Sequence, residues 1–231
     1  MKIGIISDIH ANLAALETVL PRLADCDRIL CAGDLINFGP QPEQTVQLAM
    51  TIPNLTAVRG NHESRILRQP MVCRKGPETL AHYEWTRSRL SASSLAWLQS
   101  LPPRRLLTLE GRSIALQHYG LREGGHCRRI RPEPTDADLL ELFPEPADIV
   151  VFGHDHYGCI RSVGPTLSVN CGACGCPGRD RDLARAAILR LEETVTLEPL
   201  RLTYVAEAVV RQIRQLQYPD LPHILRAFYG L

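Results

Sequence analysis

The stretch Lys2-Ile3-Gly4-Ile5-Ile6-Ser7-Asp8-Ile9-His10 is a short apolar run that ends in a carboxylate and an imidazole. A run of this kind is typical of a strand inside a parallel sheet. Leucines then recur at helical spacing over residues 13–23, and Asn12 is a suitable N-cap. The stretch therefore predicts a strand, a loop that carries Asp8 and His10, and a helix.

The same order of apolar run, polar loop and helix recurs along the chain. A second run, 28–32, ends at Gly33-Asp34, and a third, 54–58, ends at Arg59-Gly60-Asn61-His62. Strands that alternate with helices predict an α/β fold. Further strands are expected at 104–109, 113–118, 148–152, 159–163, 166–170, 186–191 and 195–202, and helices at 43–50, 78–101 (two, divided near Ser91), 206–216 and 222–229.

Potential metal ligands lie at five places where an apolar run ends or turns. In an open α/β sheet, functional groups gather beyond the carboxyl ends of the strands, so residues far apart in sequence are expected to converge on one edge. Oxygen and imidazole ligands without thiolate suit ions such as Mn²⁺, Fe or Zn²⁺. Two such ions bind a phosphoryl oxygen and activate water. The candidate residues are Asp8, His10, Asp34, Asn61, His62, His118, His154 and His156.

These residues form ordered blocks that resemble the calcineurin-like metallophosphoesterase superfamily, in which Asp-x-His, Gly-Asp, Gly-Asn-His-Asp/Glu, His and Gly-His-x-His follow one another. The chain has Asp8-Ile9-His10, Gly33-Asp34, Gly60-Asn61-His62-Glu63, His118 and Gly153-His154-Asp155-His156. Residues 37–44 and 170–173 also resemble two segments of the compact bacterial and archaeal phosphodiesterase branch, Gly-x-Gly-Pro-x-Pro-x-Glu and Asn-Pro-Gly-Ser.

The resemblance implies a fold and a role for each residue. The fold is an αββα four-layer sandwich with two mixed β-sheets, formed by residues 1–231 as a single domain. Two divalent ions are implied, from Mn, Fe, Zn or Ni, with Mn preferred. One would be held by Asp8, His10, Asp34 and His156, and the other by Asp34, Asn61, His118 and His154, so that Asp34 bridges them. The resemblance makes His62 the group that contacts phosphate and protonates the leaving oxygen.

The chain departs from the family pattern at several positions. Phosphoprotein phosphatases have Asp and Arg where this chain has Asn37 and Phe38, and symmetrical dinucleoside tetraphosphatases also have Arg there, which disfavours both activities. An amide at 37 can accept a hydrogen bond from an imidazole but stabilises imidazolium less than a carboxylate does. Tyr119, Asp155 and the segment Asn170-Cys171-Gly172-Ala173 are further departures, which are expected to tune substrate or metal.

Composition limits the alternatives. A net charge of +1 over 231 residues disfavours a nucleic-acid partner, and no stretch is long and apolar enough for a membrane span. Asp8 interrupts the region where a secretion signal would continue, so we expect a cytoplasmic chain with reduced cysteines. Cys171, Cys174 and Cys176 are expected to be buried or semi-exposed thiols. The alternative is a thiolate metal site completed by Cys159 or Cys127.

The sequence thus predicts a two-metal-dependent hydrolase of small phosphoesters, including nucleotides, with Phe38 and Tyr119 available to stack on a base. Arg122 is either a phosphate contact or a surface residue. Alternatives are a dinucleoside polyphosphate hydrolase, a phosphoprotein phosphatase, and a scaffold that keeps the fold without the chemistry. A nuclease is disfavoured by the even charge. Homo-oligomers are compatible with the sequence.

Overall fold

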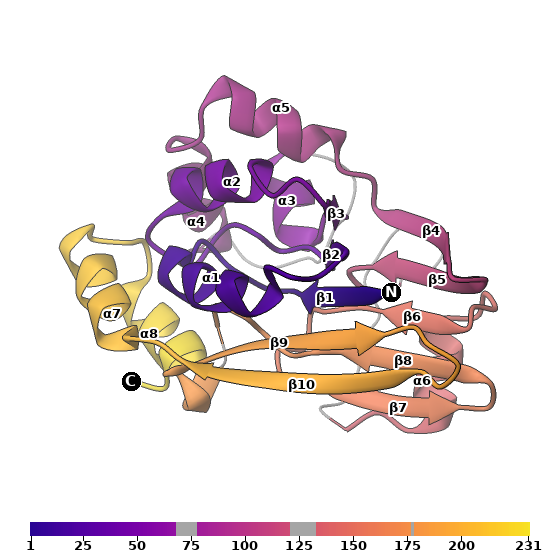
Figure 1. The fold of residues 1–231 in the computed structure, drawn as a ribbon. Helices are drawn as coiled ribbons and strands as arrows, with labels where there is room; N and C mark the ends of the chain where they lie inside the picture. Colours follow the sequence, from indigo (N-terminus) through magenta and orange to yellow (C-terminus); the bar gives the residue numbers. More distant parts are fainter. Residues whose placement is uncertain (68–77, 121–132, 177) are drawn as a thin grey trace.

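Two five-stranded sheets face each other in the computed structural model, which describes residues 1–67, 78–120, 133–176 and 178–231 (Figure 1). The sheet that carries the N-terminus, sheet A, runs from edge to edge as β10 (Thr196–Thr203), β9 (Leu183–Arg190), β1 (Lys2–Ile6), β2 (Arg28–Cys31) and β3 (Leu55–Ala57). Sheet B runs as β4 (Arg104–Leu109), β5 (Arg112–Gln117), β6 (Ile149–Val151), β8 (Thr166–Asn170) and β7 (Cys159–Val163).

Both sheets are mixed. In sheet A, β1, β2 and β3 are parallel, whereas β9 pairs antiparallel with β1 and β10. In sheet B, β5, β6 and β8 are parallel, and β4 and β7 close the edges antiparallel. The parallel strands therefore bring the carboxyl ends of β1, β2 and β3 to one edge, as the sequence pattern predicts.

Successive side chains along a strand point to opposite faces of the sheet, so the fold has two cores. One core lies between the two sheets, and the other lies under the helices. Ile3 and Ile5 of β1 point toward sheet B, where they pack with Ile114 and Val151. Ile6 points to the outer side of sheet A and packs beneath the helices. Each fully buried aliphatic side chain contributes about 1.5–3 kcal/mol, so both faces of sheet A stabilise the fold.

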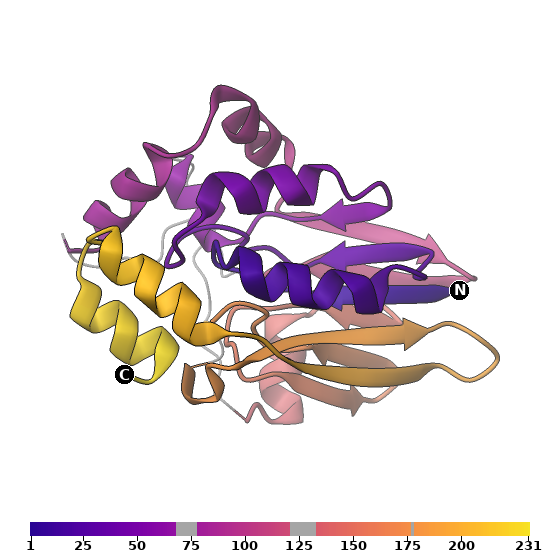
Figure 2. The same ribbon diagram turned by 60° about the vertical axis from the view of Figure 1, so that its left-hand side comes forward.

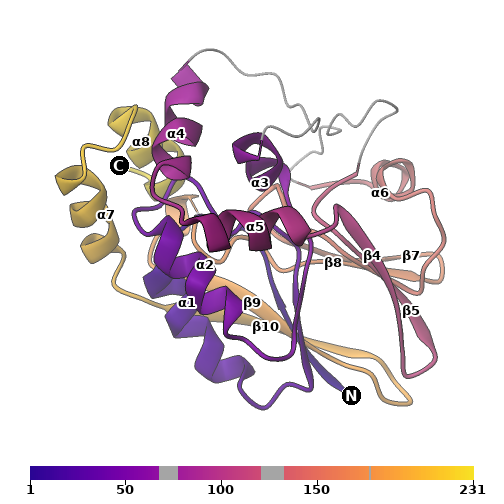
Figure 3. The ribbon, with the colours of Figure 1, turned by 90° about the horizontal axis from the view of Figure 1, so that it is seen from above.

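Helices cover the two outer faces, and the four layers confirm the predicted αββα sandwich. Over sheet A lie α1 (Leu13–Val19), which continues into a 3₁₀ turn (Leu20–Leu23), α2 (Pro42–Met50) and α5 (Ala92–Ser100). On the outer face of sheet B, α6 (Asp136–Leu142) packs against Val150 and Phe152. Figure 3 shows α1 and α2 on one side of the sheets and α6 on the other.

The C-terminal segment forms two helices that lie side by side at the end of the sheets opposite the N-terminus (Figures 1 and 2). They are α7 (Ala206–Gln215) and α8 (Leu221–Tyr229). Their apolar faces join the core on the outer side of sheet A through Val209, Ile213, Ile224 and Tyr229. The chain end is thus packed against the edge where β1 and β2 finish.

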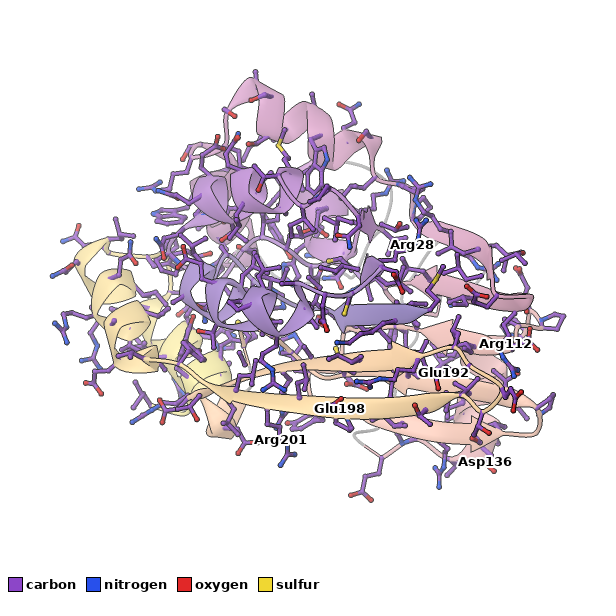
Figure 4. All side chains as sticks on the ribbon, viewed as in Figure 1. Arg28, Arg112, Asp136, Glu192, Glu198 and Arg201 are labelled. Atoms are coloured by element: carbon purple, nitrogen blue, oxygen red, sulfur yellow. The ribbon has the colours of Figure 1, made fainter. Side chains whose placement is uncertain are left out.

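Most predicted elements are present, with ends that differ by a few residues. The helix pair predicted over 78–101 is α4 (Glu78–Arg87) and α5, and the hairpin is β4 and β5. Two short helices were not predicted: α3 (Asn61–Ile66), which begins within a motif, and α6. The edge strand β10 carries Glu198 and Arg201 (Figure 4), and charged side chains disfavour edge-to-edge association. Within the described ranges, no helix combines the length and apolarity needed to cross a bilayer.

Candidate metal centre

The candidate ligands stand on loops that leave the strand ends in unusual backbone conformations. Asp8, His10, Asp34, His154 and His156 all have positive φ, between 51° and 81°. For residues other than glycine this region costs about 1–3 kcal/mol and persists where surrounding contacts enforce it. These contacts are backbone hydrogen bonds between loops, such as Asp8 N to Gly33 O and His10 N to Asp34 O, both 3.0 Å. The loops are therefore held rigidly against each other.

One cluster of donor atoms joins Asp8, His10 and His156. The Nε2 atoms of the two histidines lie 3.0 Å apart, and they lie 3.8 Å (His10) and 3.5 Å (His156) from Asp8 Oδ1. The His154 backbone N–H donates to both oxygens of Asp8 at 3.1 Å, which fixes the carboxylate. Asp8 and His10 are fully buried, so solvent does not reach these two members of the cluster.

A second cluster joins Asp34, His118 and His154, with Asn61 beside them. His118 Nε2 is 3.1 Å from Asp34 Oδ2 and 3.2 Å from Asn61 Oδ1. His154 Nδ1 is 2.8 Å from Asn61 Oδ1 and 3.3 Å from His118 Nε2. The four residues come from four different loops, so only the folded chain brings them together.

Asp34 lies between the two clusters. It also belongs to a third group of potential ligands, with His10 and His62. Its Oδ1 accepts the His62 backbone N–H at 3.0 Å, and its Oδ2 lies 3.8 Å from His62 Nε2. Every residue assigned to the site from sequence therefore lies within one continuous arrangement, and Asp34 shares one ligand group with His10 of the first cluster and another with His118 and His154 of the second.

The donor chemistry fits cations. The Ala32 carbonyl, 2.8 Å from His118 Nδ1, accepts its N–H, so in the neutral ring Nε2 turns a lone pair toward two oxygen acceptors. Such a meeting of acceptors requires a proton or a metal ion between them. Burial alone would lower the pKa of His118, but the adjacent Asp34 carboxylate raises that pKa to about 10. The pocket thus has a field strong enough to hold positive charge.

The neighbouring groups remain in states that can bind metal. Burial lowers the pKa of His154 to about 3 and the pKa of His10 well below its ordinary value, so both imidazoles are neutral. Burial would raise the pKa of Asp34, but the adjacent His118, by its charge and its hydrogen bond, holds that pKa well below its usual range. Neutral imidazoles beside an ionised carboxylate could hold divalent ions of the Mn, Fe or Zn class.

Glu63 supports the site from behind, a role that the motif did not reveal. Its buried carboxylate accepts four backbone N–H groups from two loops. Oε1 accepts from Leu35 (2.8 Å) and Ile36 (3.3 Å), and Oε2 accepts from Asp34 (3.0 Å) and Gly60 (2.6 Å). The side chain therefore ties the loop after β2 to the loop after β3. A buried carboxylate flanked by such loops is visible only in three dimensions.

The loop that carries His154 and His156 is held by hydrogen bonds that involve Asp155, Asn170 and Arg185. Asp155 Oδ1 accepts from Asn170 Nδ2 at 2.9 Å, and Arg185 donates to the His156 carbonyl at 3.0 Å. Burial and the charge of Asp8 raise the pKa of Asp155 to about 6. Asp155 thus connects this loop to the end of β8 through its hydrogen bond with Asn170.

The thiols near this loop are buried or half-buried, as predicted, with Cys171 the half-buried one of the three. Cys174 and Cys176 are almost fully buried, and burial raises the pKa of both and of Cys171. Among the described residues, the three groups that could hold a metal contain no cysteine. Cys127, considered as a fourth thiolate ligand, and Arg122, considered as a phosphate contact, lie outside the described residues.

The prediction that Phe38 and Tyr119 stack on a base is wrong. Their exposed fractions are 7% and 4%, because Phe38 lies beneath Phe228 of α8 (ring centroids 4.1 Å apart) and Tyr119 lies against His154 (4.1 Å). Phe228 is half-buried and lies 6.0 Å from the His156 ring, so it borders the site. Its place at the end of a C-terminal helix gave no sequence signal.

A family model for the calcineurin-like phosphoesterase superfamily domain matches residues 1–194. The chain belongs to this superfamily. The match confirms the resemblance drawn from the ordered blocks, and it ends before the C-terminal helices α7 and α8 begin.

Two kinds of curated relatives of this superfamily member are similar in sequence. An uncharacterized protein of Methanocaldococcus jannaschii is 27% identical over 170 residues, which is 69% of this chain and 64% of that protein. A symmetrical bis(5'-nucleosyl)-tetraphosphatase of Pseudomonas putida is 30% identical over 154 residues, covering 63% of this chain and 48% of that enzyme. The chain therefore spans 64% and 48% of the lengths of these two relatives.

Solved structures agree over nearly the whole chain. A metallophosphoesterase from Sphaerobacter thermophilus superposes with a TM-score of 0.77 at 26% identity, covering 100% of this chain and 99% of that one. A hypothetical protein from Pyrococcus horikoshii reaches a TM-score of 0.84 at 15% identity, with 96% and 97% covered, which shows the shared fold.

Proposed function

We propose that the chain is a two-metal-dependent hydrolase of phosphoester bonds that acts on small substrates, including nucleotides. The observation that carries the proposal is the convergence of Asp34, His118 and Asn61, where acceptor atoms from three loops face each other at 3.1–3.2 Å. Superfamily membership and the similarity to a Sphaerobacter thermophilus metallophosphoesterase support it.

In the proposed site, Asp34 is shared by two ions. When bound, the ions supply positive charge that polarises the phosphoryl group and lowers the pKa of the attacking water. The protein-derived ligands would be Asp8, His10, Asp34 and His156 for one ion, and Asp34, Asn61, His118 and His154 for the other. Mn²⁺ is the ion that we propose first.

His62 is proposed to act on the leaving group. Its Nε2 faces the cluster 3.8 Å from Asp34 Oδ2, and its ring is held edge-on between Phe38 (4.5 Å) and His10 (5.1 Å). A proton on this nitrogen can pass to the leaving oxygen, and a positioned acid of this kind contributes about 10²–10⁴ to the rate. The complete ligand set together with His62 distinguishes this proposal from a scaffold that lacks chemistry.

We further propose that residues 1–231 act as a single domain. Phe228 and Tyr218, from the C-terminal segment, contact Phe38 directly in the loop that follows Asp34. Removal of that segment would therefore expose the site.

Hydrolysis of dinucleoside polyphosphates is a second candidate. The relative from Pseudomonas putida and one from Methylococcus capsulatus (29% identical over 161 residues) are symmetrical bis(5'-nucleosyl)-tetraphosphatases. Rates on diadenosine tetraphosphate, bis-p-nitrophenyl phosphate and p-nitrophenyl phosphate would separate the two. A rate on the tetraphosphate at least tenfold above the other two favours the second candidate.

The proposal is tested by Asp34→Asn, which keeps the shape of the side chain but removes the charge of the bridge. With bis-p-nitrophenyl phosphate and Mn²⁺, we expect kcat to fall by roughly 10²-fold or more, because a misplaced or weakened bridge affects both ions. The matched control is Asp25→Asn, at an exposed carboxylate that pairs with Lys2. Undiminished activity of Asp34→Asn would sink the two-metal mechanism.

A further inference from the structure

A buried chain of hydrogen bonds reaches His62 from the C-terminal segment. The side chain of Asn37 contacts three groups: His62 Nδ1 at 2.8 Å, Tyr218 OH at 2.9 Å and Thr86 Oγ1 at 3.1 Å. All four residues are buried, with exposed fractions of 8% for His62 and at most 2% for the others. Because water is excluded, these groups must satisfy one another.

The direction of this chain follows from its far end. Tyr218 lies between α7 and α8, and its hydroxyl oxygen accepts the backbone N–H of Phe38 at 2.8 Å. The phenol proton is then available for Asn37, so the atom of Asn37 that faces Tyr218 is the acceptor, Oδ1. Thr86 donates to the same oxygen.

The reversed amide is a poorer arrangement. It would make the Tyr218 oxygen accept two N–H groups, and it would leave Thr86 Oγ1, 3.5 Å away, as the partner for the phenol proton. That distance is at the outer limit of a hydrogen bond. The Asn37 Nδ2 group therefore faces His62.

An amide N–H₂ group can only donate, so the nitrogen of His62 that it faces must accept. The proton of the neutral ring then resides on Nε2, the atom that faces Asp34 and the candidate metal ligands. A carboxylate at position 37 would impose the opposite arrangement, because it would accept a hydrogen bond from Nδ1–H. From the sequence, an amide at position 37 can accept a hydrogen bond from an imidazole; in the structure its Nδ2 faces His62 Nδ1 at 2.8 Å.

We infer that Tyr218 and Asn37 are positioning residues that hold His62 as the neutral Nε2–H tautomer, with its N–H directed toward the candidate metal ligands. Use of this proton in catalysis rests on the proposed function, whereas the tautomer rests on the hydrogen-bond geometry alone. Tyr218 lies beyond residue 194, where the match to the family model ends.

The experiment is long-range ¹H–¹⁵N NMR of the histidine rings in protein loaded with diamagnetic Zn²⁺, with His62 assigned from the His62→Gln variant. The wild-type protein should show His62 protonated on Nε2 and unprotonated on Nδ1. Asn37→Asp should move the proton to Nδ1. Tyr218→Phe should produce a second signal for the Nδ1–H tautomer, since Asn37 Oδ1 loses its donor and the amide can turn.

Kinetics provide a second readout, with Tyr204→Phe as the matched control. Tyr204 is equally buried in the C-terminal region, and its hydroxyl contacts Asn12 Nδ2 at 3.0 Å, away from His62. Tyr218→Phe should lower kcat roughly tenfold, part of the 10²–10⁴ supplied by a positioned acid, and change KM less than twofold. Tyr204→Phe should leave the His62 signal and kcat unchanged.

An Nδ1–H tautomer of His62 in the wild-type protein would overturn the inference. So would a Tyr218→Phe spectrum identical to the wild-type spectrum. The wild-type spectrum decides the question even where a variant does not fold. A wild-type protein that has the Nε2–H tautomer but no hydrolase activity would refute the proposed function and leave the positioning role supported.

Discussion

Gly60→Ala is a perturbation whose effect on the metal centre can be worked out from the distances. Gly60 stands immediately before α3, and its Cα faces the carboxylate of Asp34. A Cβ added there would lie 2.1 Å from Asp34 Oδ1 and 2.7 Å from its Cγ, whereas real Cβ contacts stay above 3.0 Å. Asp34 or the Gly60 loop must therefore move by about 1 Å. The φ of Gly60, −93°, is open to alanine, so the effect is steric and not a backbone strain.

A shift of this size is large for a metal ligand. Ligand distances are held to within about 0.2 Å, and a 1 Å misplacement costs about 10²-fold in rate. Because Asp34 is proposed to bridge both ions, we expect roughly 10²-fold losses in both metal affinity and kcat/KM. Overpacking should also cost about 1–3 kcal/mol of unfolding free energy.

The assay is isothermal titration with Mn²⁺ together with hydrolysis of bis-p-nitrophenyl phosphate. Gly111→Ala is the matched control. Gly111 has a φ of 73° in the β4–β5 turn, and nothing lies within 4 Å of its added Cβ. Alanine there costs about 1–2 kcal/mol of backbone strain while leaving the site untouched. A Gly60→Ala protein that binds Mn²⁺ and turns over like the Gly111→Ala protein would refute the reasoning.

Two further predictions concern Glu63, which joins the loops behind the site, and the removal of bound metal ions. Glu63→Gln leaves two of four backbone N–H groups without an acceptor, at about 1–3 kcal/mol each, partly offset by the loss of a buried charge; we expect a net loss of about 2 kcal/mol in urea unfolding. Glu43→Gln, at an exposed carboxylate that accepts one backbone N–H from Ser91, should cost less than about 1 kcal/mol. An equal cost for the Glu63 and Glu43 variants would contradict the role of Glu63 in joining the two loops. Chelation should lower the melting temperature by about 10–20 °C, because each of the two ions, at 100 times its Kd, stabilises the native state by about 2.7 kcal/mol. An unchanged melting temperature after metal removal would argue against ions bound to the native state.

The sequence predicts the fold and the set of residues at the site because both follow from local signals. Apolar runs that end in Asp8, Asp34 and His154 specify strands and place ligands at their ends, and parallel pairing of β1 and β2 brings those ends together. The ordered motifs then identify the family. Strand ends could be located only to within a few residues, because pairing partners and not local propensity decide where a strand stops.

What could not be predicted depends on contacts between distant segments. Glu63 reads as the last residue of a motif, yet its importance lies in four N–H groups from two loops. The burial of Phe38 depends on Phe228, which is 190 positions further along the chain and on a helix with no motif. The direction of the Asn37 amide depends on Tyr218 in the same way. Such pairings have no periodicity and leave no trace in a single sequence.

The central claim is that two cations share Asp34. The most direct test is anomalous diffraction from crystals of the protein loaded with Mn²⁺. We predict two anomalous peaks per chain, one beside Asp8, His10 and His156 and one beside Asn61, His118 and His154, with Asp34 in contact with both. A single peak, or peaks that do not contact Asp34, would contradict the account.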